Sequence, residues 1–552
     1  MSDSLRKVYS DNEQSHVFEF LDRNLIPVED RETFLSSLSL IDVPLVNELF
    51  QATAAASSAP AVSELLEPCK DVTRVSTTSQ EQLLEWRNVG LQGIATGKFA
   101  VLILAGGQGT RLGSDRPKGE YNIGLPSGKC IFQLQAERVI KLIEEAEKVF
   151  NENEEGSGVG KRRVSLPVYV MTSPMTDADT RAFFESKAFF GLPTEDVRFF
   201  CQGTLPCLTD NGKIMLESAG KVAEAPDGNG GIYRALHLSG CISDMKTRGI
   251  KGVHVFSVDN VIIKVGDPVF LGFCYTRGAD VGSKACPKAG PHEKVGVLCK
   301  RGGRYTVVEY SEMDKASAEL VDVTTNELVY NAGNICIHYY SIDFLEKECS
   351  PAGLPKVYHF AKKAIPFADP ITGLTLSKDQ LTSHCKTTGK ATTGIKMESF
   401  IFDVFPQAKN LAALEIQRNE EFAPVKNAPG SADDSPDTAR TMIYTLHRKW
   451  LEKAGAIFVS SSSEERTGKE EEEQVVEVSP LLSYGGEGLD LFNQVELYAP
   501  LLAIREGEVL SEKYKDIQFT RLTTQVSSKQ GKPVMNTLEK ASVFGLNVYK
   551  VV

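Results

Sequence analysis

A glycine-rich segment of this chain carries two cationic side chains. Gly106, Gly107 and Gly109 directly follow a run of apolar residues. A turn without side chains lets backbone N–H groups approach a polyanion closely, because no Cβ stands in the way. Arg111 and Lys118 add positive charge to the same segment. These residue types and their spacing predict a site for a ligand that carries phosphate groups.

The segment differs from the two commonest phosphate-binding loops. A dinucleotide-binding loop would have a glycine at position 112, where this chain has Leu112. A Walker A loop would end in Gly-Lys followed by Ser or Thr, and the later pair Gly128-Lys129 is followed instead by Cys130. The sequence therefore indicates a nucleotide-binding loop of another kind.

Polar residues that could contact a nucleotide or a sugar occur further along the chain. Gln202-Gly203 and the run APDGNGGIYRAL at residues 225–236 supply amides and small residues suited to base and sugar edges. Asp259-Asn260 follows the apolar run 253–258, which has the composition of a buried strand. Ligands of open α/β sheets collect at the carboxyl ends of strands, so we expect Asp259 to face the ligand.

The elements that must position these residues follow from the apolar pattern. Residues 99–105 form a continuous apolar run, which predicts a strand buried on both faces of a parallel sheet. Residues 136–151 are predicted to form a helix and residues 166–172 the next buried strand. Apolar strands alternate with amphipathic stretches over residues 99–446, which is typical of an α/β domain.

The two ends of the chain differ from this central part. Residues 11–50 have apolar residues at near-helical spacing, and we expect these helices to shield an edge of the core. A charged insert at 460–474 precedes short β-branched runs, which predict a small β-rich domain. We therefore divide the chain into an N-terminal helical region, a catalytic domain and a small C-terminal domain, at residues 1–98, 99–450 and 451–552.

Composition limits the classes of partner. The net charge is −12 and no run of basic residues is long enough for a nucleic-acid footprint or a polybasic membrane patch. The chain has neither an apolar signal-like start nor an apolar stretch of about 20 residues, so we expect a cytoplasmic protein without a membrane span. Its 11 cysteines are scattered singly, without a Cys-x-x-Cys pair, and predict neither a disulfide framework nor a zinc site.

Several ordered motifs resemble those of a known family. The run LAGGQGTRLGSDRPKG at 104–119 resembles the signature of the sugar nucleotidyltransferases. When this run is considered together with the later motifs, the chain closely resembles the eukaryotic-type UDP-N-acetylglucosamine pyrophosphorylases. The resemblance extends from about residue 80 to about residue 484. Those motifs are PDGNGG at 226–231, VDN at 258–260, VEYSE at 308–312, NAGNI at 331–335, GIKME at 394–398, EFAPVKN at 421–427 and SPLLSYGGEGL at 479–489. The first 80 residues match only loosely, and the 460–474 insert has no recognisable counterpart.

The resemblance implies a fold and a reaction. The fold would be a Rossmann-like mixed central sheet of the nucleotidyltransferase, or GT-A-like, kind. The reaction would convert UTP and N-acetylglucosamine 1-phosphate to UDP-N-acetylglucosamine and pyrophosphate, with Mg²⁺ as cofactor and Mn²⁺ as an alternative. The sugar phosphate itself would attack the α-phosphorus in line, so no enzyme nucleophile is needed.

The resemblance also implies roles for individual residues, by their positions in the motifs. Nucleotide contacts would come from Leu104, Ala105, Gly106, Gly107, Gln202 and Gly228. The cationic groups that bind phosphates would be Arg111, Lys118, Lys396 and Lys426, with Lys396 toward the nucleotide and Lys426 toward the sugar phosphate. Sugar contacts would come from Asn229, Glu309, Tyr310 and Asn334, with Asn334 on the N-acetyl group. Asp259 would hold the metal, and Asp403 is a weaker candidate for a second ligand.

Two other functions remain open at this point. One is a UDP-glucose or broad-specificity UDP-sugar pyrophosphorylase, against which the NAGN motif argues. The other is a catalytically silent relative that binds UDP-sugars, against which the joint presence of Arg111, Lys118, Asp259 and Lys426 argues. The sequence predicts neither the oligomeric state nor the discrimination between N-acetylglucosamine and N-acetylgalactosamine.

Overall fold

The structure is a computed structural model. It describes residues 2–58, 66–154, 163–354, 358–388, 392–459, 474–508, 518–523, 526–527, 533–534, 537–543 and 545–552. Of the charged insert expected at 460–474, only Gln474 falls among these residues.

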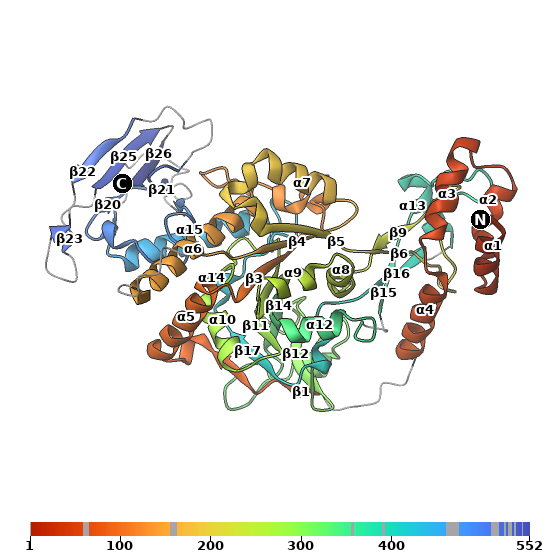
Figure 1. The fold of residues 1–552 in the computed structure, drawn as a ribbon, viewed down its shortest axis with the longest axis horizontal. Coiled ribbons are helices and arrows are strands. Elements are labelled where there is room, and N and C mark those ends of the chain that lie inside the picture. Colours follow the sequence, from red (N-terminus) through yellow and green to blue (C-terminus); the bar gives the residue numbers. More distant parts are fainter. Residues whose placement is uncertain are drawn as a thin grey trace.

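A mixed central sheet forms the middle of the molecule (Figure 1). Its main path runs β2-β17-β11-β14-β10-β3-β4-β5, and β1, β12 and β13 pair beside it. All neighbours on the main path are parallel except β14, which is antiparallel to both β10 and β11. The α/β fold class with a mixed sheet is therefore confirmed. The strands are β1 Leu66–Pro68, β2 Val72–Arg74, β3 Phe99–Leu104, β4 Val168–Thr172, β5 Val197–Cys201, β10 Gly252–Ser257, β11 Val281–Pro287, β12 Val297–Arg301, β13 Arg304–Val308, β14 Ala332–Ser341 and β17 Leu411–Glu415.

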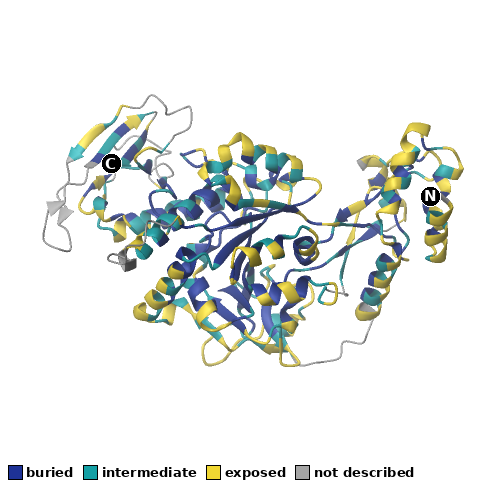
Figure 2. Ribbon diagram, viewed as in Figure 1, coloured by how far each residue is buried: buried dark blue, intermediate teal, exposed yellow. Residues whose placement is uncertain are grey.

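Helices cover both faces of this sheet. Val101 and Ile103 of β3 belong to a core with α5, α6 and α10, whereas Leu102 and Leu104 belong to a second core with α8, α9 and α12. Successive strand residues point to opposite faces, so the all-apolar composition of β3 follows from burial on both sides. Figure 2 shows the strands at the centre of the sheet, such as β3, β4 and β10, as almost uniformly buried. The helices are α5 Gln80–Ala95, α6 Ile131–Glu154, α8 Ile232–Leu238, α9 Cys241–Thr247, α10 Pro268–Thr276 and α12 Ile342–Cys349.

The helices α5 and α10 approach each other closely through glycines. A Cβ at Gly90 would lie 2.0 Å from the carbonyl oxygen of Pro268, and one at Gly272 would lie 1.9 Å from that of Trp86.

Both α5 and β2 precede residue 99, yet they pack in the central α/β layers. The domain limits predicted from the sequence remain predictions.

The N-terminal helices pack on a separate small lobe. Tyr9, Phe18, Phe34 and Val46 form one core with Leu216 and other apolar residues of that lobe. In Figure 1 these helices lie at the opposite end of the molecule from the C-terminus. The helices are α1 Ser2–Asp11, α2 Glu19–Asp22, α3 Arg31–Ser39 and α4 Val43–Ser58, and the lobe contains β6 Thr204–Pro206, β7 Leu216–Ser218, β8 Lys221–Val222, β9 Glu224–Pro226, β15 His359–Lys363, α13 Lys378–Thr388 and β16 Gly394–Glu398.

The C-terminal part forms a five-stranded sheet beside α15, which agrees with the β-rich composition of the tail. A buried ion pair joins this part to α6, because Lys129 Nζ lies 2.6 Å from both Glu137 Oε2 and Glu508 Oε1. The elements are α15 Pro436–Lys453, β19 Val476–Val478, β21 Leu501–Arg505, β22 Thr520–Thr523, β25 Thr537–Val543 and β26 Leu546–Val551.

Within the described ranges, no single helix has the length and apolar character to cross a membrane. One bent pair, formed by residues 28–39 and 43–56, meets the requirement by length and composition alone.

Candidate active site

The glycine-rich segment forms a tight loop at the carboxyl end of β3. The carbonyl oxygen of Gly106 accepts a hydrogen bond of 2.8 Å from Ser173 Oγ, and that of Gly107 accepts one of 3.1 Å from the backbone N–H of Lys118. The loop therefore folds back on itself and brings Lys118 beside the glycines. Arg111 is exposed and forms no ion pair with any residue that the structure describes.

The loop after β3 meets the turn after β10. These strands are parallel neighbours with Leu104 opposite Ser257, so both turns lie at the same edge of the sheet. Lys118 Nζ lies 3.7 Å from Asp259 Oδ2, and the two side chains are 17% and 13% exposed. The structure thus places a cation and a carboxylate together where the strand pattern predicted a ligand.

Gln202 borders the loop, and Gly228 lies on a separate segment that packs against Ser399. A Cβ at Gly106 would lie 3.0 Å from Gln202 Nε2, so the Gln202 amide lies against the glycines. Gly228 has a φ of +88°, and a Cβ there would lie 2.3 Å from the carbonyl oxygen of Ser399. Only glycine fits this position without backbone movement. Ser399 directly follows β16, so the lobe contributes to the site.

Cys336 on β14 lies among several of the predicted site residues. Asn229 Nδ2 lies 3.9 Å from Cys336 Sγ, and Asn229 Oδ1 accepts a hydrogen bond from Ile401 N. Burial raises the pKa of the Cys336 thiol to about 12. The carboxylates of Asp259 and Glu309 add to this increase in pKa, whereas Lys426 opposes it. Asn229 thus contacts Cys336, and Asp259, Glu309 and Lys426 lie close enough to influence the pKa of its thiol.

An irregularity in β14 shapes this part of the site. Cys336 has a φ of 54°, and the register against β11 shifts between Ser283 and Ala285. A non-glycine residue in the left-handed region is strained and tends to occur at functional sites. Two residues before it, Asn334 Oδ1 is buried and has no hydrogen-bond partner among the described residues. A buried amide oxygen without a partner is unfavourable in the free protein and suits a ligand that donates an N–H.

Lys396, Lys426 and Tyr310 each have neighbours that are not predicted site residues. Lys396 lies half-buried on β16, opposite Ala361, and among the described residues it forms no hydrogen bond or ion pair with another predicted site residue. Lys426 Nζ lies 3.3 Å from Asp434 Oδ2. Tyr310 is half exposed and lines a cavity of about 330 Å³ together with Lys288. The functional roles of all the predicted residues remain predictions.

His359 is a charged neighbour of the site that sequence reasoning missed. Its ring lies between two carboxylates, with Nε2 3.1 Å from Asp403 Oδ1 and Nδ1 3.5 Å from Glu312 Oε1. Burial alone would lower the pKa of His359, but hydrogen bonds to Asp403 and Glu312 raise it to about 10. Asp403 also accepts a hydrogen bond from Phe400 N at 2.7 Å. Both oxygens of Asp403 are therefore engaged within the protein, which argues against it as a second metal ligand.

Asp227 is a second group that the sequence did not single out. It lies next to Gly228, is 4% exposed, and its Oδ1 has no partner in the part of the chain that the structure describes. Its backbone carbonyl accepts hydrogen bonds from both the N–H and the hydroxyl of Ser399. Burial raises the pKa of the Asp227 carboxyl to about 7, against the opposing charge of Arg234.

We expect Asp227→Asn to become more stable relative to the wild-type protein as pH rises. The carboxyl binds its proton more tightly when folded than when unfolded, so its contribution to stability is complete below about pH 4 and is lost as pH rises to about 7. The full loss would be up to roughly 4 kcal/mol, and the variant lacks it. The measurement is the difference in Tm between the two proteins at pH 5, 6, 7 and 8. Glu477, whose pKa burial also raises to about 7, is common to both proteins, so a constant difference would refute a protonated Asp227.

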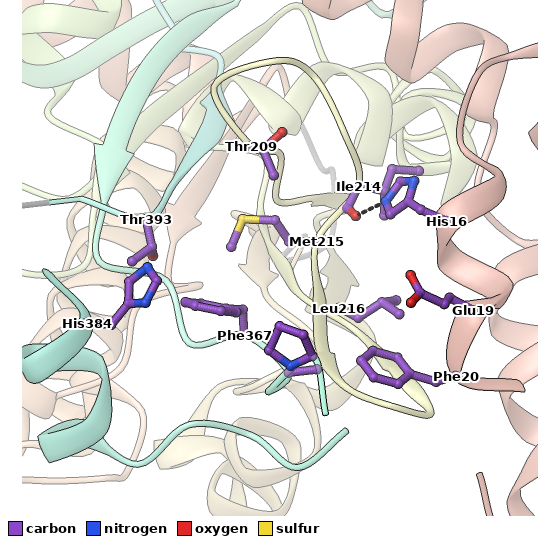
Figure 3. A pocket seen from close by; sticks show the side chains of 12 residues that line it. His16, Glu19, Phe20, Thr209, Ile214, Met215, Leu216, Phe367, His384 and Thr393 are labelled. Atoms are coloured by element: carbon purple, nitrogen blue, oxygen red, sulfur yellow. Dashed lines mark hydrogen bonds between the residues drawn. The ribbon is translucent and has the colours of Figure 1, made fainter. Parts of the chain in front are cut away.

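A separate cavity lies between the N-terminal helices and the lobe (Figure 3). It has a volume of about 350 Å³ and is lined by aromatic, aliphatic and hydroxyl side chains, among them Phe20, Met215, Phe367 and Thr393. His16 Nε2 lies 2.7 Å from the carbonyl oxygen of Ile214 at one side of it. None of the residues predicted from the sequence as ligands lines this cavity.

Comparisons with known proteins find a matching family model and relatives that cover most of the chain. Residues 48–467 match the model of the family described as UTP–glucose-1-phosphate uridylyltransferase. The chain is 40% identical to the UDP-N-acetylglucosamine diphosphorylase 2 of Arabidopsis thaliana over 86% of this chain and 89% of that protein. It is 38% identical to the UDP-N-acetylglucosamine pyrophosphorylase of Saccharomyces cerevisiae, over 84% and 92%. Among solved structures, it resembles the Trypanosoma brucei uridine diphosphate N-acetylglucosamine pyrophosphorylase, with a TM-score of 0.72, 30% identity and coverage of 89% and 94%.

Proposed function

Because this chain belongs to the UTP–glucose-1-phosphate uridylyltransferase family, and within it to the UDP-N-acetylglucosamine pyrophosphorylases, we propose that it catalyses uridylyl transfer from UTP to N-acetylglucosamine 1-phosphate. The products are UDP-N-acetylglucosamine and pyrophosphate. The observation that carries the proposal is the meeting of Lys118 and Asp259 at one edge of the sheet, with Asn229, Glu309 and Lys426 nearby.

The reaction needs positioning and charge compensation rather than a protein nucleophile. A phosphate oxygen of the sugar 1-phosphate forms a new bond to the α-phosphorus of UTP. The bond between that phosphorus and the bridging oxygen to the β-phosphate breaks, and pyrophosphate leaves with the electron pair. In the proposed mechanism, Lys118 offsets the charge on the triphosphate and Lys426 offsets the charge on the sugar phosphate. Charge compensation by fixed groups and alignment of the two substrates account for catalysis of this kind.

Asp259 is suited to a divalent cation that is shared with the substrate. Mg²⁺ is usually held by one or two carboxylates, and phosphate oxygens and water complete its octahedral shell. Across the described ranges, no group of three or more His, Cys, Asp or Glu side chains could form a metal site by itself. When bound, Mg²⁺ would neutralise phosphate charge and align the triphosphate. We therefore propose Mg²⁺ as cofactor, with Mn²⁺ as an alternative and Asp259 as its carboxylate ligand.

Asp259→Asn should raise the Mg²⁺ concentration needed for half-maximal activity by about tenfold or more. The substitution removes the negative charge of the ligand but keeps its shape, and a charge-assisted contact contributes roughly 1.5–3 kcal/mol. The measurement is the rate of pyrophosphate release against Mg²⁺ concentration for both proteins at saturating UTP. Asp244→Asn, which changes an aspartate on α9 that pairs with Arg198 and Arg248, is the control. Identical activation curves for Asp259→Asn and the wild type would argue against a metal role.

The substrate is tested by one assay. Pyrophosphate release is measured with UTP and, in turn, the 1-phosphates of N-acetylglucosamine, N-acetylgalactosamine and glucose. We expect the highest kcat/KM with N-acetylglucosamine 1-phosphate. A preference for glucose 1-phosphate would instead support the UDP-glucose alternative, and UDP-sugar binding without turnover would support a silent relative. The cytoplasmic location remains a prediction from the sequence.

A further inference from the structure

Three buried charged side chains, together with the partly exposed Lys264, join the segment that follows β10 to the segment that follows β17. Lys284 is completely buried on β11, and its Nζ lies 2.5 Å from Asp267 Oδ2 and contacts the carboxylate of Glu421. Lys264 Nζ lies 3.1 Å from Glu421 Oε1. The cluster therefore contains two cations and two anions, and its charges balance.

The members of this cluster lie close in sequence to two predicted ligands. Asp267 caps the N-terminus of α10, in the segment that begins with Asp259. Glu421 is the last residue of α14 (Arg418–Glu421), five positions before Lys426. The cluster thus ties together the segments that carry the metal ligand and the sugar-phosphate lysine of the proposed mechanism.

Hydrogen bonds from the Asn260 side chain and from the backbone fix the register of these two segments. Asn260 Nδ2 donates to the carbonyl oxygen of Glu421 at 2.7 Å, and Asn260 Oδ1 accepts from the backbone N–H of Ala423 at 3.0 Å. The backbone N–H of Val425 donates to the carbonyl oxygen of Asp259 at 3.0 Å. A shift of the Glu421 end would therefore move Lys426 relative to Asp259.

Stability alone does not explain why the side chains of this cluster are charged. Buried ion pairs lose most of their attraction to desolvation, and apolar residues of similar volume often stabilise a fold equally well. Burial would raise the pKa of Glu421, but Lys264 and Lys284 lower it well below its usual value, so the carboxylate is ionised. An ionised carboxylate held by two lysines has one defined position, whereas an apolar side chain could settle in several.

We propose that Glu421 is a positioning residue, which through Lys264 and Lys284 fixes the Lys426 segment against the Asp259 turn and so places the sugar phosphate relative to UTP. This inference rests on the proposed uridylyltransferase function and deepens it. It assigns no contact with substrate to Glu421 itself.

The double variant Lys264→Met/Glu421→Gln tests the proposal. It removes one cation and one anion together and leaves the Lys284–Asp267 pair in place, so no buried charge is left without a partner. Because misplacement of a binding group by about 1 Å can lower rates a hundredfold, we expect kcat/KM for N-acetylglucosamine 1-phosphate to fall by tenfold or more. The loss should come mainly from a higher KM for the sugar phosphate, and the KM for UTP should stay within about threefold.

The triple variant Lys129→Met/Glu137→Gln/Glu508→Gln is the matched control. It removes a buried lysine and both of its glutamate partners at the junction between α6 and the C-terminal sheet, so no buried charge is left without a partner there either. We expect this control to lower Tm but to keep both KM values. If the Glu421 cluster has only a structural role, Lys264→Met/Glu421→Gln will likewise lower Tm and keep both KM values. A folded Lys264→Met/Glu421→Gln enzyme with wild-type KM for both substrates would therefore overturn the proposal.

Two further measurements keep the test decisive. If the Lys264→Met/Glu421→Gln protein does not fold, Glu421→Asp is used, which keeps the charge and shortens the side chain by one methylene group. A higher KM for the sugar phosphate supports the proposal there too, and an unchanged KM overturns it. The wild-type enzyme is assayed in parallel, because an inactive wild type would contradict the proposed function, whereas an active wild type with an unaffected variant contradicts only the positioning role.

Discussion

Lys118→Ala should lower kcat/KM for UDP-N-acetylglucosamine formation by ten- to a hundredfold without loss of the fold. Lys118 lies beside the glycine loop and 3.7 Å from Asp259, so its ammonium group can offset charge on the triphosphate and the leaving pyrophosphate. A hydrogen bond from a charged group contributes roughly 1.5–3 kcal/mol, which corresponds to that change in rate. The measurement is steady-state pyrophosphate release, with Tm as a check on folding.

Arg116→Ala is the matched control for Lys118→Ala. Arg116 is a cation in the same loop, but it is exposed and pairs with Glu120 and Asp179. Exposed ion pairs contribute about 0–1 kcal/mol to stability, so we expect a kcat/KM within about threefold of the wild-type value. Equal losses in the two variants would mean that the loop responds to general positive charge, and a fully active Lys118→Ala would remove Lys118 from the mechanism.

The second large effect concerns selection of the sugar. Asn334→Ala should lower kcat/KM for N-acetylglucosamine 1-phosphate by roughly tenfold or more while barely changing it for glucose 1-phosphate. Asn334 Oδ1 is buried and finds no partner within the described part of the chain, so it can accept a hydrogen bond from the acetamido N–H. A substrate that leaves such a group unpaired is strongly disfavoured, which gives more discrimination than a missing methyl group would.

Asn331→Ala separates this effect from a change in the turn. Asn331 belongs to the same NAGN motif, but its Oδ1 already accepts a hydrogen bond of 2.8 Å from the backbone N–H of Lys288. Loss of the Asn331 side chain should change kcat/KM for both sugar phosphates by a similar factor. The quantity compared is the ratio of kcat/KM for the two sugar phosphates in each protein. If Asn334→Ala leaves that ratio unchanged, Asn334 has only a structural role and the selectivity arises elsewhere.

Features with a local signal could be predicted from the sequence. The uninterrupted apolar run of β3 and the glycines after it predicted the buried strand and the loop at its end. Lys118 and Asp259 follow the parallel strands β3 and β10. Ligands of open α/β sheets collect at the carboxyl ends of the strands, which is why both residues could be expected at one site. Motif resemblance gave the family, which the comparisons confirm.

Features that depend on distant segments could not be predicted in this way. His359, Glu312 and Asp403 meet from three separate segments, and none of them has a local pattern that indicates an ion pair. A lysine is normally expected at the surface, so the complete burial of Lys284 in a sheet strand had no signal in composition. The left-handed conformation of Cys336 interrupts a strand that an apolar pattern describes as regular.

The packing of the N-terminal helices on the lobe has a consequence for synthesis of the protein. Tyr9, Phe18 and Phe34 leave the ribosome before Leu216 and Met397, which are among their packing partners. At roughly 5–20 residues per second, the last of these partners is translated tens of seconds later. During that interval the nascent chain exposes an apolar surface that only the late segments can cover. We therefore expect newly made chains to depend on chaperones, and chains released before residue 397 to aggregate.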